Sequence, residues 1–232
     1  MPRAMSKRGS ENGNRYSPTG REVLTGVTRQ LIDVTNPRPE QIDIRDIAQS
    51  LARQERFTGH CPLRPSVAAH SLAVEYIGRQ LMDAGGEFCV RDMGEACKAL
   101  LLHDAPEFLV SDLNGAVKQD MRPMLVGAAR RASAAIRGRS RFDLLEDRAE
   151  AAIAKRFGFD SEAYDDLIHE ADVLACAYEM AYDGWAPEAQ PPEWLRSDEE
   201  VMVIYMPFAS GMTSDEVTQA LFLSRAAELG IR

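Results

Sequence analysis

The stretch LLHDAPEFLVSDL, residues 101–113, places four ionisable side chains directly after the apolar run Ala99–Leu102. They are His103, Asp104, Glu107 and Asp112. Burying an unpaired carboxylate in a protein core costs several kcal/mol. A helix that only needed to pack would not carry Asp104 at this position. The stretch therefore predicts a partner that offsets the charge.

The composition is typical of a soluble globular protein. The chain has 232 residues, of which 45% are hydrophobic and 27% charged, enough for one domain with a substantial core. The formal net charge of −9 argues against a nucleic-acid partner, because nucleic-acid binders neutralise phosphates with basic residues. This charge still allows a small anionic substrate, held by a local basic pocket and a metal ion.

Two features predict a cytoplasmic protein that does not enter a membrane. The longest apolar run, VMVIYMPFASGM at 201–212, contains Pro207 and is shorter than the roughly 18 apolar residues of a membrane span. The N-terminus shows no secretory signal and the cysteines form no C-x-x-C pair, so we expect reduced thiols. The cysteines are Cys61, Cys89, Cys97 and Cys176.

Helical periodicity predicts an all-α fold. We expect a polar tail and lead-in over 1–35, a single domain over 36–230, and a proline-rich loop over 183–200. Helices are expected at about 44–52, 66–84, 93–104, 119–137, 143–157, 162–182 and 213–229. The expected N-caps are Asp43 and either Thr213 or Ser214, and the expected terminators are Gly85, Gly158 and Gly230. No alternating stretch is long enough to predict a strand.

Three of these helices carry a polar residue on an apolar face. His70 lies on the stripe from Val67 to Leu81, Asp104 ends the apolar face of helix 93–104, and Asp172 is the only charged residue in 171–178. Alone, such a histidine usually bonds a backbone carbonyl, and such a carboxylate usually pairs with arginine. Together with His103, they form the donor set that a divalent metal requires. Imidazole with carboxylate suits Mn, Fe, Co, Ni or Zn better than Ca.

The order of these residues resembles the H…HD…D signature of the HD-domain metal-dependent phosphohydrolases. The blocks SVAAHSLAV, LLHDAPEFLVSDLNGAVK and EAD resemble those of the HD-domain 5′-deoxynucleotidases. Residues 36–71 resemble the front of a bacterial and phage branch, similar to nucleotidases and deoxynucleoside triphosphate hydrolases. The likeness covers about residues 36–182. It implies an HD-domain helical bundle with the metal site in its core.

The resemblance also implies a ligand set for one divalent ion. The ligands are His70, His103, Asp104 and Asp172. The ion is expected to be Co, Mn, Zn, Fe or Ni, with Mg as an alternative that binds together with the substrate phosphates. Adjacent helical residues point about 100° apart, so His103 and Asp104 reach one ion only near a helix end. Pro106 favours such an end.

Two further carboxylates are expected at the reaction centre. In the related nucleotidases, the positions that match Glu107 and Asp112 lie there. Glu107 is expected to hold or deprotonate the attacking water, and Asp112 to position water or the leaving 5′ oxygen. The alternative for both residues is a solvated loop carboxylate.

Five residues are expected to bind the substrate. Arg56 matches the phosphate-binding arginine of the deoxynucleotidases, and Phe57 stands where those enzymes have a tryptophan that packs on base or sugar. His60 and Arg64 lie in the same loop, and either contact substrate or are structural. Lys118 either pairs with phosphate or is solvated.

The sequence therefore predicts a metal-dependent phosphohydrolase that cleaves a phosphate ester of a (deoxy)nucleotide, most similar to a 5′-nucleotidase. The alternatives are a dNTP triphosphohydrolase and a catalytically silent helical protein that binds metal or nucleotide. We expect a small nucleotide as partner, no nucleic acid, no membrane, and a homo-oligomer of two or more subunits, since related nucleotidases are commonly dimers.

Overall fold

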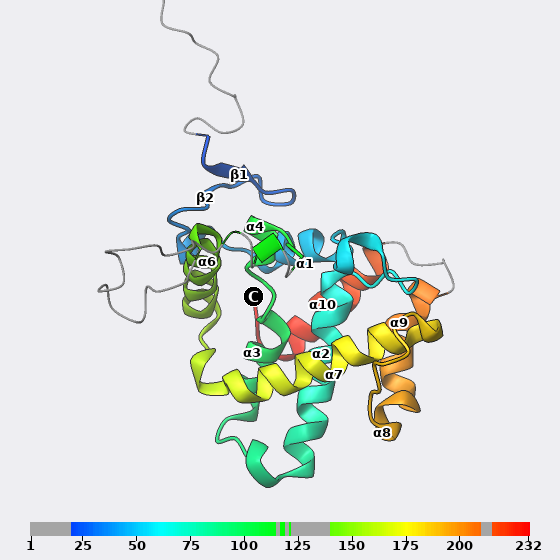
Figure 1. Ribbon diagram of the computed structural model, residues 1–232. Helices are drawn as coiled ribbons and strands as arrows, with labels where there is room; N and C mark the ends of the chain where they lie inside the picture. Colours follow the sequence, from blue (N-terminus) through cyan, green and yellow to red (C-terminus); the bar gives the residue numbers. More distant parts are fainter. Residues whose placement is uncertain (1–19, 115–116, 119–120, 122–139, 210–214) are drawn as a thin grey trace, which may run out of the picture.

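The computed structural model describes residues 20–114, 117–118, 121, 140–209 and 215–232, and helices dominate these residues. The long helices are α1 (Ile44–Ala52), α2 (Val67–Ala84), α3 (Met93–Leu102), α6 (Arg141–Phe157), α7 (Asp165–Ala181), α9 (Glu199–Ala209) and α10 (Asp215–Glu228). The four-residue helices are α4 (Glu107–Val110) and α8 (Glu193–Arg196). The all-α prediction is confirmed at this level, and Figure 1 shows the arrangement.

Helix α2 lies at the centre of the molecule, where it crosses α7 (Figure 1). It packs against α3 and α7, while α1 packs against α10. Gly78 permits the close approach of α3, because a Cβ at this position would lie 2.5 Å from Leu100 Cδ1. Residues of α2 contribute to both apolar clusters of the core, for example Val67 to one and Ile77 to the other. The central helix therefore fixes the positions of the elements around it.

Several helix ends agree with the sequence. Asp43 caps α1, Ser66 caps α2, and Gly85 follows the last residue of α2. Helix α6 begins at Arg141, two residues earlier than expected, because Ser140 and Asp143 form a capping box. Other predicted features lie outside the described residues: helix 119–137, apart from Met121, and the caps Thr213 and Ser214.

The predicted tail contains a short β-hairpin, so the expectation of no strand was wrong. Strands β1 (Glu22–Leu24) and β2 (Leu31–Asp33) pair antiparallel, with Val23 opposite Ile32. The Asp46 carboxylate on α1 accepts hydrogen bonds from the backbone of the connecting turn, including Val27 N–H at 2.7 Å. Ile32 is fully buried. Three-residue strands are too short for alternation to reveal, and a tertiary anchor holds this hairpin.

The prediction of a loop over 183–200 was wrong for the second half of this range, which contains α8 and the start of α9. Pro192 directly precedes α8, a place where proline suits a helix start. The Asp198 carboxylate accepts hydrogen bonds from the N–H groups of Glu200 and Val201 at the beginning of α9. Pro192 therefore marks the start of a helix and not the continuation of a loop.

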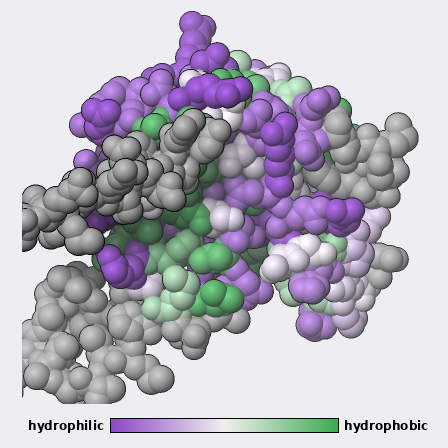
Figure 2. Space-filling view, turned by 90° about the horizontal axis from the view of Figure 1, so that it is seen from above, coloured by the Kyte–Doolittle hydropathy of each residue, from purple (hydrophilic) through white to green (hydrophobic). Residues whose placement is uncertain are grey.

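Polar residues dominate the coloured part of the face shown in Figure 2. In the face shown in Figure 2, hydrophilic residues cover most of the coloured area, and hydrophobic residues gather in a smaller region near the middle. None of the helices in the described residues combines the length and hydropathy that a bilayer crossing requires.

Candidate metal centre

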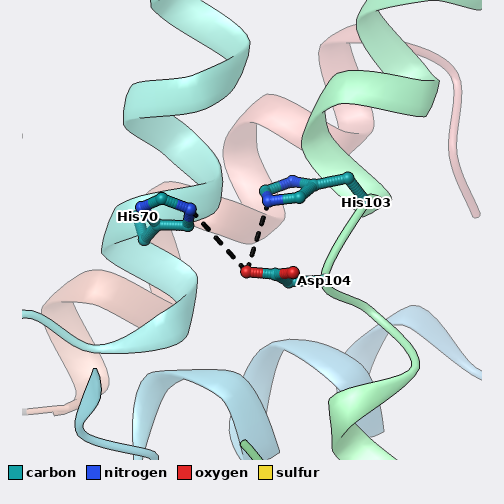
Figure 3. A group of neighbouring side chains, drawn as sticks. All are labelled: His70, His103 and Asp104. Atoms are coloured by element: carbon teal, nitrogen blue, oxygen red, sulfur yellow. Dashed lines mark ion pairs between the residues drawn. The ribbon is translucent and has the colours of Figure 1, made fainter. Parts of the chain in front are cut away.

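Three helices bring the four predicted metal ligands together. His70 lies in the first turn of α2, His103 and Asp104 directly follow α3, and Asp172 lies in the middle of α7. His70 Nε2 lies 3.7 Å from Asp104 Oδ2 and 2.9 Å from Asp172 Oδ1, and His103 Nε2 lies 3.2 Å from Asp104 Oδ2. Figure 3 shows both imidazole rings directed at the Asp104 carboxylate.

Both histidines present an unsatisfied nitrogen to this cluster. His70 Nε2 and His103 Nε2 are buried, and neither makes a hydrogen bond of good geometry within the described residues. Their Nδ1 atoms form hydrogen bonds. His70 Nδ1 lies 3.1 Å from Glu179 Oε1, and His103 Nδ1 lies 2.9 Å from the Leu100 carbonyl oxygen. A metal-binding histidine has this pattern. The hydrogen bond at Nδ1 fixes the orientation of the ring, and the Nε2 lone pair stays available for a metal ion. The donor set therefore fits a divalent metal ion.

The cluster offers two overlapping donor groups. In each group the ligand atoms lie within 4.8 Å of one another: His70, His103 and Asp104 form one, and His70, Asp172 and Cys176 form the other. Cys176, which the sequence assigned to packing, donates a hydrogen bond to Asp172 Oδ1 at 3.4 Å. Burial raises the pKa of its thiol. Cys176 follows Asp172 by four residues on α7, so helical spacing already placed it on this face.

The charges of the cluster stabilise one another. Burial opposes ionisation of Asp104, but His103, His70 and Arg56 outweigh it and hold the pKa of this carboxyl well below its usual range. Burial likewise opposes the charged form of His70, yet Glu179 and Asp172 raise the pKa of its imidazole to about 9. The carboxylates are thus ionised at neutral pH and ready to bind a cation.

Arg56 reaches the same cluster from the segment before α2. Its side chain is largely buried, and its Nη1 lies 3.2 Å from Asp104 Oδ2 and its Nε 3.2 Å from Glu179 Oε2. Its Nη2 donates to Cys176 Sγ at 3.1 Å. The predicted phosphate-binding arginine therefore lies beside the predicted metal ligands.

Glu107 is buried beside the cluster and has one unsatisfied oxygen. It is the first residue of α4, and no described residue forms a hydrogen bond with its Oε2. Burial, together with the carboxylates of Asp104 and Asp112, raises the pKa of Glu107 to about 9. Asp112 is partly exposed, and its N–H donates to Gln54 Oε1 at 3.1 Å. A solvated loop carboxylate would not have the surroundings of Glu107.

The remaining predicted substrate residues lie further out. The Phe57 ring packs edge-on against Trp185, with ring centroids 5.3 Å apart. Arg64 pairs with Glu55 at the surface, and His60 is exposed. Lys118 Nζ lies 2.9 Å from Glu146 Oε1 and is close enough to Glu107 to influence its charge. Contact of these residues with a substrate stays a prediction.

A cavity of about 390 Å³ borders Glu107 on the side of the hairpin. Its wall includes Thr25 of the hairpin turn, Gln49 and Ser50 of α1, and Phe108 of α4. The volume lies in the range of small-molecule sites.

The sequence did not reveal the importance of Glu179 and Tyr205. Glu179 is completely buried behind His70, and the Tyr205 hydroxyl donates to its Oε1 at 2.7 Å. One signal was present: Glu179 follows Asp172 by seven residues, which places both carboxylates on one face of α7. Tyr205 lies on α9, so only the tertiary structure links it to this site.

The comparisons with known proteins give no function. No protein-family model matches the chain. A protein of Rhodobacter capsulatus, named only as uncharacterized, is 35% identical over 129 residues, which is 55% of this chain and 54% of the relative. The chain thus matches about half the length of that relative.

Proposed function

We propose that the protein is a metal-dependent phosphohydrolase of the HD-domain type that cleaves the phosphate ester of a small (deoxy)nucleotide, in the manner of a 5′-nucleotidase. One observation carries the proposal: two buried histidine Nε2 atoms without hydrogen bonds face two carboxylates, and an arginine lies beside them. The resemblance of His70, His103–Asp104 and Asp172 to the H…HD…D signature supports it.

The residues divide into metal ligands and groups that handle substrate. His70, His103, Asp104 and Asp172 would hold the ion. Such an ion supplies Lewis-acid chemistry, since it makes water easier to deprotonate and draws electron density from a phosphoryl oxygen. Arg56 binds the phosphate, for which its guanidinium is suited through two parallel hydrogen bonds.

Glu107 accepts the proton of the attacking water. Its unsatisfied oxygen faces no competing hydrogen-bond donor among the described residues, so a water proton is a natural partner. A positive charge on the ligand cluster lowers the pKa of Glu107, because it offsets the repulsion by Asp104. Asp112 orients the water or the leaving 5′ oxygen, and the cavity beside Glu107 accommodates the nucleoside part.

A substrate panel tests the proposal. The protein is stripped of metal, reloaded separately with Mn, Co, Zn or Mg, and incubated with nucleoside mono-, di- and triphosphates while products are identified. We expect release of inorganic phosphate from deoxynucleoside monophosphates, and loss of this release in His103→Ala. His169→Ala is the matched control, because His169 is an exposed histidine of α7 outside the cluster. Release of tripolyphosphate from dNTPs, or no turnover of any nucleotide, overturns the nucleotidase assignment.

A further inference from the structure

The carboxylate of Glu179 holds three donors from three different parts of the chain. Its side chain is completely buried in α7. Oε1 lies 3.1 Å from His70 Nδ1 and accepts the Tyr205 hydroxyl at 2.7 Å, while Oε2 accepts Arg56 Nε at 3.2 Å. The two oxygens therefore serve a predicted metal ligand on one side and the predicted phosphate-binding residue on the other.

This arrangement determines which atoms of His70 and Arg56 remain for ligands. When His70 Nδ1 donates to Glu179, only Nε2 is left for the cluster, and this atom points at Asp104 and Asp172. When Arg56 Nε donates to Glu179, the guanidinium is held with Nη1 toward Asp104. One buried carboxylate thus orients both side chains.

We propose that Glu179 is a positioning residue that orients His70 for metal binding and Arg56 for anion binding at the same time. The metal part of this inference needs only a metal at the cluster, whereas the anion part rests on the proposed function. Because one group serves both, its loss weakens the binding of metal and of phosphate together. Supporting groups of this kind typically contribute about 10- to 100-fold to metal affinity.

The chain provides a matched control in Glu75. This glutamate is also almost fully buried, and its Oε1 pairs with Arg225 Nη2 at 2.6 Å and Arg79 Nε at 3.0 Å. Like Glu179 it compensates a partly buried arginine, but it contacts none of the cluster residues in the described structure. A general effect of losing a buried carboxylate therefore appears in Glu75→Gln as well.

The experiment measures binding of Co(II) and of inorganic phosphate to wild type, Glu179→Gln and Glu75→Gln, with thermal unfolding as a check on folding. We expect Glu179→Gln to bind Co(II) about 10- to 100-fold more weakly, with an altered visible Co(II) spectrum, and to lose affinity for phosphate. Glu75→Gln should stay within about twofold of wild type for both ligands, since the arrangement around His70 is intact. Wild-type Co(II) affinity in folded Glu179→Gln overturns the inference.

A second measurement needs no variant. In the Zn(II)-loaded wild type, NMR of ¹⁵N-labelled histidine should show a slowly exchanging proton on His70 Nδ1, held by Glu179. Absence of that proton, or binding of the metal through Nδ1, overturns the inference. Normal nucleotide turnover with no effect of Glu179→Gln on Co(II) affinity contradicts the positioning role alone. The expected Co(II) results without turnover of any nucleotide contradict only the proposed function.

Discussion

Glu107 carries its carboxylate in surroundings that oppose ionisation. Burial and the neighbouring carboxylates of Asp104 and Asp112 raise its pKa to about 9, and Lys118 and Arg56 only partly compensate. At this pKa the carboxyl of the metal-free protein is protonated at neutral pH, and a positive charge on the ligand cluster lowers the pKa toward the range that suits a general base. The role of Glu107 therefore distinguishes an enzyme from a protein that only binds metal and nucleotide.

Replacement of this residue tests its role in the reaction. Glu107→Gln keeps the shape and removes the basic function, so metal and nucleotide still bind. We expect kcat to fall at least about a hundredfold, with little change in nucleotide Kd. Steady-state kinetics and equilibrium binding on the metal-loaded protein measure the two quantities. Near-normal turnover would remove Glu107 from the mechanism and shift the base role to Asp112.

The raised pKa of Glu107 also predicts a pH dependence of stability in the metal-free protein. Between the ordinary pKa of 4.5 and about 9, the folded protein holds a proton that the unfolded chain releases. The contribution of Glu107 is therefore fully present below pH 4.5 and is lost as pH rises toward 9, by up to about 1.4 kcal/mol per pH unit. Glu107→Gln has no ionisable group at this position, so its stability does not fall for this reason as pH rises.

Denaturant unfolding of both metal-free proteins at about pH 5.5 and about pH 8 measures this difference. We expect the variant to gain stability relative to wild type at the higher pH. A stability difference that stays constant between the two conditions would show that Glu107 titrates normally.

At the scale of elements, the contact of α2 with α3 determines where the histidines lie relative to each other. Gly78 and Leu100 meet at this contact, within about three helical turns of the two histidines. We expect Gly78→Val to destabilise the protein by about 1–3 kcal/mol, because the added methyl groups overlap Leu100 in a closed core. Thermal or denaturant unfolding measures the change.

The control for this substitution is Ala84→Val at the exposed end of the same helix, which changes helix propensity without overpacking. Equal stability of Gly78→Val and Ala84→Val would show that α3 adjusts freely and that the contact does not fix the site.

The elements also show why the sequence predicted some structure and not the rest. The helix capped by Asp43 and the helix that begins at Ser66 could be predicted, because apolar periodicity and capping are local features. The hairpin could not, because its turn is held by Asp46 from α1. Helix α9 was also missed, since its first residues belong to the proline-rich stretch 183–200 that was predicted as a loop.

At the scale of the whole molecule, the candidate site depends on α2, α3 and α7 meeting at one point. The gathering of the four residues could be predicted, because His70, Asp104 and Asp172 each interrupt an apolar face and because the order of the residues resembles a known signature. Metal binding by them stays a prediction. Glu179 was missed, since its partner Tyr205 comes from α9 and its burial arises only when α7 packs on α2. Local patterns predict which residues face inward, but not which of them meet.

The central claim is that His70, His103, Asp104 and Asp172 bind one divalent metal ion. Metal content measured by mass spectrometry after loading with Co(II) or Mn(II) and desalting tests this directly, with His169→Ala as control. We expect about one ion per chain in wild type and control, and loss of stoichiometric binding in the His70→Ala/His103→Ala protein, whose helical circular dichroism is largely retained. Unchanged metal content in the folded double variant would contradict the account.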